Sequence, residues 1–196
     1  MGKRIFLVKS STAFTEPIFD LKCISSSSGR IDVVCRCILN SFFIDKSIFR
    51  RNVIFYSVLE GPPSPPKTIC IDGSKVEKFI LNEVWIASVI ADLMSGKSFS
   101  GFNIHKMGFK DIIEKLVKGN VKLIYMHENG ILIDEFKFDL NSNYCFIIGD
   151  QFGLDLSSEK YLEFIGVPKI SLGRVPYLSS QCIWLINNFL DEIGFE

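Results

Sequence analysis

Residues 146–154 read Phe-Ile-Ile-Gly-Asp-Gln-Phe-Gly-Leu, and residues 167–173 read Val-Pro-Lys-Ile-Ser-Leu-Gly. Each stretch contains a short apolar run that ends at a glycine, Gly149 in the first and Gly173 in the second. A glycine directly after a buried strand lets a ligand approach the main chain closely, because no Cβ stands in the way. Open α/β sheets bind nucleotides in this manner, at the carboxyl ends of their strands. The two stretches therefore predict an α/β sheet with a small-molecule site near the end of the chain.

The rest of the chain alternates between strand-like and helix-like patterns. Apolar, β-rich runs predict strands at residues 4–9, 53–59, 68–71, 122–126, 144–148 and 169–172. Helical periodicity predicts helices at residues 31–43, 83–94, 110–117 and 179–193. Strands that alternate with helices indicate an α/β fold with a mostly parallel sheet flanked by helices.

Length and composition favour one well-filled domain over residues 1–196. Hydrophobic residues make up 47% of the chain, including 18 phenylalanines. The apolar run near the N-terminus, residues 5–8, is too short for a signal peptide or a membrane span, so we expect a soluble, cytoplasmic protein. The six cysteines form no Cys-x-x-Cys pair, which favours free thiols and predicts no metal site.

Charge is distributed unevenly along the chain. Residues 1–110 contain 15 Lys and Arg but 9 Asp and Glu, a net charge of +6, whereas residues 111–196 contain 7 and 13, a net charge of −6. A basic half is typical of proteins that bind a polyanion such as nucleic acid. A dipolar surface without a partner would give the same counts.

Several polar residues admit both a functional and a structural interpretation. Asp32 and Arg36 lie four residues apart near the start of a predicted helix, together with Arg30. They could form an exposed ion pair of little energetic value, or hold a polar heterocycle and a phosphate. His127 and Asp150 follow predicted strands and could bind a ligand, or be a solvated loop residue and a turn former. Cys182 belongs to the apolar stripe of the last helix, which favours packing against a ligand over nucleophilic chemistry.

The chain lacks the common catalytic and nucleotide-binding motifs. It contains no Gly-x-Gly-x-x-Gly, no Gly-x-x-x-x-Gly-Lys-[Ser/Thr], no Gly-x-Ser-x-Gly and no histidine pair at metal spacing. Classical dinucleotide oxidoreductases, P-loop enzymes, α/β-hydrolases and zincins are therefore disfavoured.

Six segments, in order along nearly the whole chain, resemble one known family. Residues 29–37 read Gly-Arg-Ile-Asp-Val-Val-Cys-Arg-Cys, and residues 51–66 read Arg-Asn-Val-Ile-Phe-Tyr-Ser-Val-Leu-Glu-Gly-Pro-Pro-Ser-Pro-Pro. The others are Met-Gly-Phe at 107–109, Met-His-Glu-Asn-Gly at 126–130, Phe-Ile-Ile-Gly-Asp at 146–150, and Ile-Ser-Leu at 170–172 followed by Cys182. Together they resemble TrmY, the archaeal tRNA pseudouridine N1-methyltransferase family.

This resemblance implies a SPOUT methyltransferase fold with a C-terminal trefoil knot, the cofactor-binding knot covering residues 122–193. It implies S-adenosylmethionine as cofactor, a homodimer, and methylation of N1 of pseudouridine in the tRNA T-loop, at position 54. Carried over residue by residue, it implies these cofactor contacts: Met126, Gly149, Ile170, Ser171, Leu172, Gly173, Arg174, Val175 and Cys182.

The resemblance also suggests which residues act on RNA. We expect Asp32 to orient or deprotonate the base, and Arg30 and Arg36 to stabilise negative charge on its carbonyl oxygens. The residues expected along the RNA backbone are Lys9, Lys46, Arg50, Arg51 and Lys106. The chain departs from the family pattern at Val84, at His105 and Lys106, and at residues 178–181, which bears on RNA contacts. The alternatives are a Nep1-like enzyme acting on ribosomal RNA, and a knotted RNA-binding or assembly factor without turnover.

Overall fold

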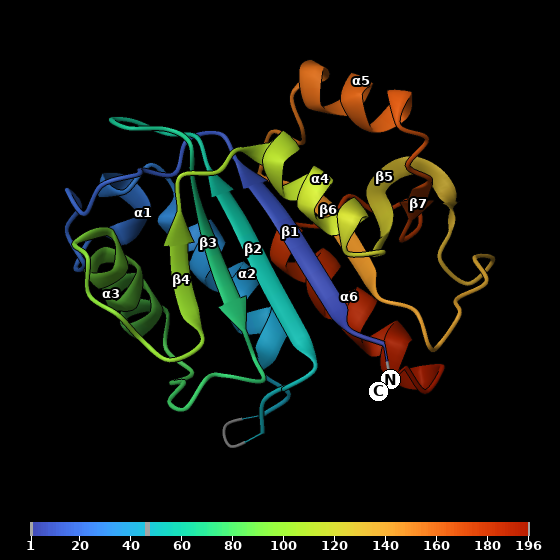
Figure 1. The fold of residues 1–196 in the computed structure, drawn as a ribbon, viewed down its shortest axis with the longest axis horizontal. Helices are drawn as coiled ribbons and strands as arrows, with labels where there is room; N and C mark the ends of the chain where they lie inside the picture. The colour runs from blue at the N-terminus through green and yellow to red at the C-terminus, as the bar shows by residue number, and fades with distance from the viewer. Residues whose placement is uncertain (1, 46–47, 196) are drawn as a thin grey trace.

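A computed structural model describes residues 2–45 and 48–195. The described residues form one seven-stranded sheet in the order β4-β3-β2-β1-β6-β5-β7 (Figure 1). The strands are β1 (Arg4–Ser10), β2 (Val53–Leu59), β3 (Lys67–Asp72), β4 (Phe102–His105), β5 (Lys122–Leu132), β6 (Tyr144–Gly149) and β7 (Lys169–Ser171). The helices are α1 (Ile24–Ser27), α2 (Ile31–Phe42), α3 (Glu83–Met94), α4 (Phe109–Lys118), α5 (Leu156–Phe164) and α6 (Ser179–Glu192).

The sheet is mostly parallel, as the sequence predicts. β1 pairs in parallel with β2 and β6, and β5 pairs in parallel with β6 and β7. Only the β2–β3 and β3–β4 pairs are antiparallel, and the proline-rich residues 60–66 connect the first of them. The carboxyl ends of β1, β2, β6, β5 and β7 therefore lie at one edge of the sheet.

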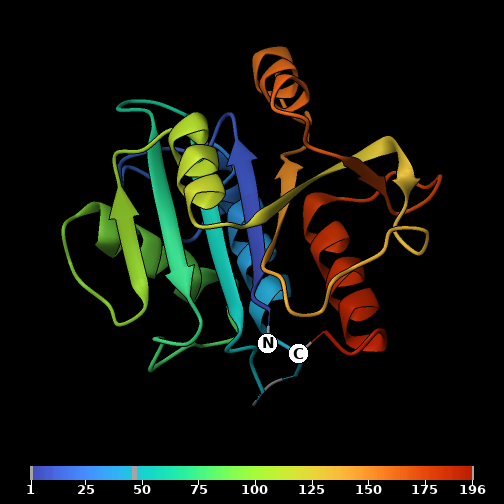
Figure 2. The same ribbon diagram turned by 45° about the vertical axis from the view of Figure 1, so that its right-hand side comes forward.

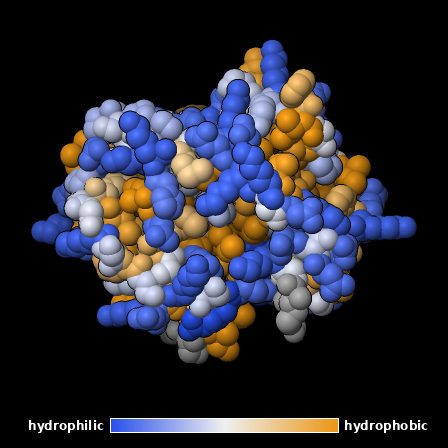
Figure 3. Space-filling model, in the orientation of Figure 1, coloured by the Kyte–Doolittle hydropathy of each residue, from blue (hydrophilic) through white to orange (hydrophobic). Residues whose placement is uncertain are grey.

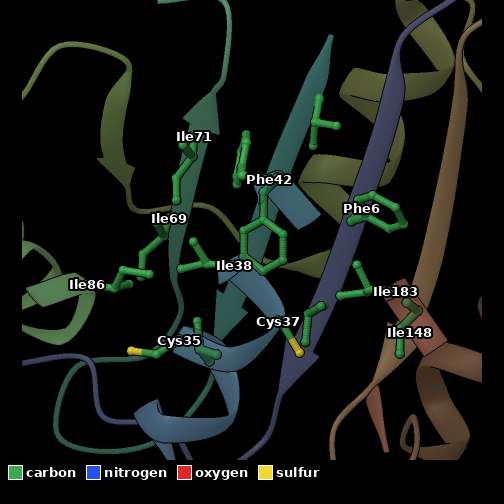
Figure 4. Close-up of a cluster of buried hydrophobic side chains, with 14 of the residues drawn as sticks. Phe6, Cys35, Cys37, Ile38, Phe42, Ile69, Ile71, Ile86, Ile148 and Ile183 are labelled. Atoms are coloured by element: carbon green, nitrogen blue, oxygen red, sulfur yellow. The ribbon is translucent and has the colours of Figure 1, made fainter. Parts of the chain in front are cut away.

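Helices cover both faces of the sheet and enclose two separate cores. Figures 1 and 2 show α4 on one face and α2, α3 and α6 on the other, while α5 projects beyond the carboxyl ends of the strands. The larger core packs α2, α3 and α6 against the sheet, and the smaller one packs α4 and α5 against it. In Figure 4, side chains from α2, such as Ile38 and Phe42, converge with Phe6 of β1 and Ile183 of α6.

A partly exposed ionic cluster joins the last helix to the amino ends of the strands. Arg4 is 1% exposed and contacts Asp191 of α6 at 2.7 Å. Arg50 also donates to Asp191, Nη1 to Oδ1 at 2.8 Å, and Arg4 donates to the main-chain carbonyl of Phe195. These contacts place the C-terminal residues beside the start of β1.

The structure adds elements that the sequence pattern does not predict. β4 has four residues, and α5 buries only Ser158 and Leu162. β5 continues past Met126 to Leu132, with a register shift in its pairing to β7 between Met126 and Ile131. No helix among the described residues is long and apolar enough to cross a membrane. The trefoil knot stays a prediction, because strand order does not fix how the last segment is threaded.

Candidate functional site

A cleft of about 420 Å³ opens at the carboxyl edge of the sheet. Its walls come from the end of β5, the loop after β6, the loop after β7 and the start of α6. This volume lies in the range of small-molecule sites, roughly 300–1,000 Å³. The two glycine-ended stretches therefore meet at one cleft, although β5 separates β6 from β7 in the sheet.

The structure brings together eight of the nine predicted cofactor residues. The cleft is lined by Met126, Gly149, Ile170, Ser171, Leu172, Gly173, Val175 and Cys182. Arg174 instead lines an adjoining hollow of about 320 Å³, beside Glu128, Asn129 and Gly130. Burial raises the pKa of Cys182 to about 11, so its thiol is neutral at physiological pH and contributes apolar surface.

The two terminal glycines serve different purposes. A Cβ on Gly149 would lie 2.2 Å from the main chain of Gly153, so this glycine accommodates the turn at 150–153 rather than a ligand. Gly173 has a φ of +110°, and no atom lies within 4 Å of the position a Cβ would take. The open space beside Gly173 therefore leaves room for a ligand, whereas the space beside Gly149 is taken by Gly153.

The composition of the cleft fits S-adenosylmethionine. Ile148, Ile170, Leu172 and Met126 supply apolar surface, suited to an adenine ring. Main-chain groups of the two glycine loops supply donors and acceptors, and the open side positions of Gly153 and Gly173 leave room against the backbone. The cofactor is cationic at sulfur, and the cleft lining contains Glu128, Asp150 and Glu159 but neither Lys nor Arg.

One polar cluster in the cleft was missed by the sequence analysis. The Tyr125 hydroxyl donates to Glu159 Oε1 at 2.6 Å, and His127 Nε2 lies 3.9 Å from the same oxygen. Burial, with the bond to Glu159, raises the pKa of Tyr125. The sequence offers His127 as a possible ligand-binding residue, whereas Glu159 lies on α5, a helix that the sequence pattern does not predict.

A second set of charged residues lies at the same edge of the sheet. Arg30 Nε donates to Asp32 Oδ1 at 3.0 Å, and Arg30 Nη2 donates to Oδ2 at 3.2 Å. Arg36 Nη2 donates to Oδ2 at 2.6 Å. The Asp32 side chain is 2% exposed, whereas the side chains of Arg30 and Arg36 are each 40% exposed. The structural interpretation as an exposed ion pair is therefore wrong for the carboxylate, which is buried between two accessible guanidinium groups.

The electrostatics of Asp32 argue against a role as proton acceptor. Burial would raise the pKa of its carboxyl group, but the hydrogen bonds from Arg30 and Arg36 outweigh burial and lower it. Both oxygens are occupied by donors. Asp32 is thus suited to orienting the two arginines rather than to removing a proton.

Local backbone geometry positions Arg30. Its φ is +82°, in the left-handed region that residues other than glycine rarely adopt. Gly29 precedes it with a φ of +60°, and a Cβ there would lie 2.0 Å from the carbonyl oxygen of Thr12. The loop after β1 therefore packs directly against the turn that presents Arg30.

The structure separates the residues predicted to contact RNA. Lys106 is exposed just after β4, at the carboxyl edge. Arg50 and Arg51 precede β2 at the opposite edge, where Arg50 binds Asp191 and Arg51 lies over the Phe49 ring. Lys46 lies outside the described residues.

Lys9 does not face an open surface. Its side chain is 8% exposed and binds two carboxylates, Glu60 at 2.8 Å and Asp155, the N-cap of α5. The sequence around Lys9 does not reveal these partners, which lie 51 and 146 residues away along the chain. Lys9 is therefore disfavoured as a phosphate contact.

A second hollow, of about 470 Å³, lies between α4 and α5. It is lined mainly by apolar residues, and Figure 3 shows apolar atoms gathered where these helices approach each other. No glycine loop at a strand end contributes to it, and no three His, Cys, Asp or Glu side chains gather as a metal site in residues 2–45 and 48–195. The cleft at the carboxyl edge is the better candidate for the functional site.

Comparisons with known proteins identify the family of this chain. Residues 3–195 match the family described as "Putative SAM-dependent RNA methyltransferase". The chain is 35% identical over 195 residues to the tRNA (pseudouridine(54)-N(1))-methyltransferase of Methanococcus maripaludis strain C5, covering 96% of this chain and 98% of that protein. The enzyme of the same name from Pyrococcus abyssi is 35% identical over 205 residues, covering 97% of this chain and 98% of that protein.

Solved structures confirm the predicted SPOUT fold. Archaeoglobus fulgidus Nep1 bound to S-adenosylhomocysteine superposes with a TM-score of 0.66 at 15% identity, covering all of both chains. The ribosomal RNA small subunit methyltransferase E of Neisseria gonorrhoeae, bound to S-adenosylmethionine, has a TM-score of 0.53 at 11% identity, covering 97% of this chain and 66% of that one. On the family match and the full-length identity, this chain belongs to the S-adenosylmethionine-dependent RNA methyltransferases that include the archaeal tRNA pseudouridine N1-methyltransferases.

Proposed function

We propose that this protein methylates N1 of pseudouridine 54 in the T-loop of tRNA. The relatives named for this reaction match the chain over nearly its full length. The structural observation that carries the proposal is the presence of two complementary sites at one edge of the sheet. One is a cleft with main-chain walls, and the other is a pair of accessible arginines held by Asp32.

The cleft supplies the cofactor-binding half of the reaction. When bound, S-adenosylmethionine provides a methyl group attached to a sulfonium sulfur. The positive charge on the sulfur already makes this methyl group electrophilic, so no metal ion is needed to activate it. We assign its contacts to the eight predicted residues that line the cleft, with Glu159 added to them. Arg174, which lines the adjoining hollow, is left as an outer contact.

The arginine cluster supplies the base-binding half. N1 of pseudouridine carries a weakly acidic imide-type proton, and its loss places negative charge on the neighbouring carbonyl oxygens. Arg30 and Arg36 are placed to stabilise that charge with N–H groups that do not bind Asp32. Asp32 keeps both guanidinium groups in one orientation, and the N1 proton passes to water. Catalysis then depends mainly on in-line placement of the two reactants.

The RNA-binding surface follows the same edge. Lys106 stands at the end of β4 on that edge and is a candidate phosphate contact. Arg50 and Arg51 lie at the other edge, so a contact with them requires RNA that extends around the molecule. The charge asymmetry of the sequence is consistent with such an extended contact.

The proposal also includes a homodimer and a cytoplasmic location. Apolar side chains are exposed on α6 and on the loop before it, with Trp184 54%, Leu178 63% and Val175 59% exposed. An exposed apolar group of this kind beside the cleft is suited to a second copy of the chain, which would complete the site. We treat residues 1–196 as one domain because all seven strands join one sheet, and a tRNA-modifying activity suits the cytoplasm.

The experiment is a methyl-transfer assay with nucleoside mass spectrometry. T-arm RNA carrying pseudouridine at position 54, the same RNA carrying uridine, and a ribosomal hairpin carrying pseudouridine compete for the enzyme. The proposal predicts N1-methylpseudouridine in the first RNA alone. Preference for the ribosomal hairpin would favour the Nep1-like alternative, and absence of cofactor binding would favour a factor without turnover.

A further inference from the structure

We propose that Ser11 and Asp150 form a strut that sets the position of the cofactor loop relative to the Arg30–Asp32–Arg36 cluster. Both residues would then be positioning residues for methyl transfer rather than contacts of the reacting atoms. The inference rests on the proposed function, because it assumes that the cleft holds the methyl donor and that the arginines hold the acceptor base.

One end of the strut lies in the cofactor loop. Asp150 directly follows β6, lines the cleft and is 6% exposed. Its Oδ1 accepts a hydrogen bond from the Phe152 N–H at 2.9 Å, which closes the turn between Gly149 and Gly153. Its Oδ2 points out of this turn and accepts two bonds from Ser11.

The other end lies in the loop that follows β1. The Ser11 N–H donates to Asp150 Oδ2 at 2.7 Å, and the Ser11 hydroxyl donates to the same oxygen at 2.6 Å. A carboxylate oxygen that accepts two such bonds is held more firmly than one with a single neutral partner. The carboxyl edge of β1 and the cofactor loop are therefore joined at one atom.

The loop after β1 also contacts the turn that presents Arg30. The Phe14 N–H donates to the Ser28 carbonyl at 3.0 Å, and Gly29 lies so close to Thr12 that no Cβ fits between them. Arg30 is the next residue and adopts its left-handed conformation against this packing. A displacement of Ser11 would thus be transmitted through three residues of packed main chain to the Arg30 turn.

Lys9, two residues before Ser11, makes a second connection between this part of the chain and the cofactor loop. Lys9 binds Asp155, which caps the N-terminus of α5, and it also binds Glu60 after β2. Burial would raise the pKa of Asp155, but the bonds from Lys9, Ser157 and Ser158 outweigh it and keep the carboxylate charged. The cofactor loop, residues 150–155, is therefore bonded at one end to Ser11, just after β1, and at the other end to Lys9 of β1.

The physical reason for such a device is geometric. Methyl transfer needs the donor methyl and the acceptor nitrogen in line at near-contact distance, and a displacement of 1 Å can lower a rate about 100-fold. The cleft and the arginines come from opposite parts of the chain, residues 149–154 and 29–36. The two Ser11–Asp150 hydrogen bonds join the cofactor loop to the loop that packs against the Arg30 turn.

The test combines kinetics with hydrogen exchange on the full-length protein. Asp150→Asn replaces one of the two acceptor oxygens by an NH2 group, so either the two Ser11 donors or the Phe152 N–H faces a donor. Ser11→Ala removes the hydroxyl and leaves the main-chain bond. At saturating S-adenosylmethionine, the single-turnover rate on pseudouridine RNA is expected to fall about 10- to 100-fold in Asp150→Asn and about three- to tenfold in Ser11→Ala. In Ser11→Ala, the Kd for S-adenosylmethionine should change less than about threefold, because Ser11 does not line the cleft. Asp150 lines the cleft, so its variant is compared at saturating cofactor, where a weaker Kd no longer limits the rate.

Two variants serve as controls. Ser11→Thr keeps the hydroxyl and should restore at least half of the wild-type rate. Ser10→Ala removes a neighbouring buried hydroxyl that has no hydrogen-bond partner among residues 2–45 and 48–195, and it should leave the rate unchanged. A nonspecific weakening of β1 would affect Ser10→Ala as much as Ser11→Ala.

Hydrogen exchange distinguishes failure of the strut from failure of the proposed function. Adding S-adenosylhomocysteine to the wild type should slow exchange at residues 149–154 and also at 11–15. In Asp150→Asn it should slow exchange at 149–154 alone. Equal protection of 11–15 in both proteins, or variant rates that recover fully when S-adenosylmethionine is raised, would overturn the strut. A wild type that binds the cofactor and shows both protections, but methylates no pseudouridine RNA, would instead overturn the proposed function.

Discussion

Arg30 donates two parallel hydrogen bonds to Asp32, from Nε to Oδ1 at 3.0 Å and from Nη2 to Oδ2 at 3.2 Å. Paired guanidinium–carboxylate contacts of this type fix orientation as well as charge. Arg36 binds the same carboxylate from one helical turn further on. Asp32 is therefore the common anchor of two cationic groups at the edge where the cofactor cleft opens.

The first prediction concerns Asp32→Asn. The amide cannot hold two guanidinium groups, so we expect methyl transfer at saturating substrate to fall about 100-fold, the scale seen when one organised donor is lost. The Kd for S-adenosylmethionine should stay unchanged, because Asp32 does not line the cleft. Isothermal titration and single-turnover kinetics measure the two quantities.

The pH dependence of that variant separates orientation from proton removal. The pKa of Asp32 is lowered, so it remains ionised at every pH above its ordinary range. If Asp32 only orients the arginines, the rate of Asp32→Asn falls by the same factor across pH 6 to 9. A change in the shape of its pH–rate profile would restore the proton-acceptor role.

The second prediction concerns the ionic cluster at the other edge. Asp191→Asn removes the carboxylate that Arg4 and Arg50 both contact, and we expect the free energy of unfolding to fall by about 1–3 kcal/mol, reduced because Asp191 is partly exposed. Asp134→Asn, at an exposed loop residue, is the matched control. Denaturant unfolding measures both.

The difference between wild type and Asp191→Asn should depend on pH. Burial alone would raise the pKa of Asp191, but the hydrogen bonds from Arg50 and Arg4 outweigh burial and hold it below its ordinary value. The stabilisation is therefore present above the ordinary carboxyl pKa and is lost as the pH falls through the lower folded value. A difference that persists unchanged at the most acidic pH would show that it does not arise from ionisation.

The third prediction concerns Gly173→Ala. The new Cβ would stand in the open space along the cleft, at a φ of +110° that alanine rarely adopts, so we expect cofactor binding to weaken about tenfold, or about 1.4 kcal/mol. Gly96→Ala is a matched control, because Gly96 also has a positive φ and open space but lies outside the cleft. An equal loss of affinity in both variants would attribute the effect to backbone strain.

The fourth prediction concerns Trp184→Glu. A charge on the exposed face of α6 should shift the protein from dimer to monomer in sedimentation velocity, because a buried carboxylate opposes association. Phe164→Glu introduces the same charge at an apolar side chain that is 88% exposed on α5 and should leave the oligomeric state unchanged. Dissociation by Phe164→Glu alone would place the interface on α5 instead.

Much of the sheet was predictable because its strands are buried on both faces. Val53–Leu59 and Tyr144–Gly149 read as continuous apolar runs, and the structure forms strands there. β4 was not predicted because it has only four residues, most of them not buried. α5 was not predicted because it buries only two side chains. In both cases the tertiary contact, rather than the local pattern, stabilises the element.

The parts of the candidate site that depend on local sequence could be predicted. The parts that depend on residues distant in sequence could not. Glycine after a strand pointed to the cleft, although at Gly149 the space is filled by Gly153. The role of Lys9 was not visible, because its carboxylates come from the ends of β2 and α5. Local pattern shows where a strand ends but not which charges meet there.

The most direct measurement maps the methyl group on full-length tRNA that carries a single pseudouridine, at position 54. The protein is incubated with this tRNA and labelled S-adenosylmethionine, and the RNase fragments are analysed by mass spectrometry. We predict one methyl group per tRNA, on N1 of that pseudouridine, and none on the matched tRNA with uridine 54. Methylation of the uridine tRNA at the same rate, or a methyl group on any other nucleotide, would contradict the account.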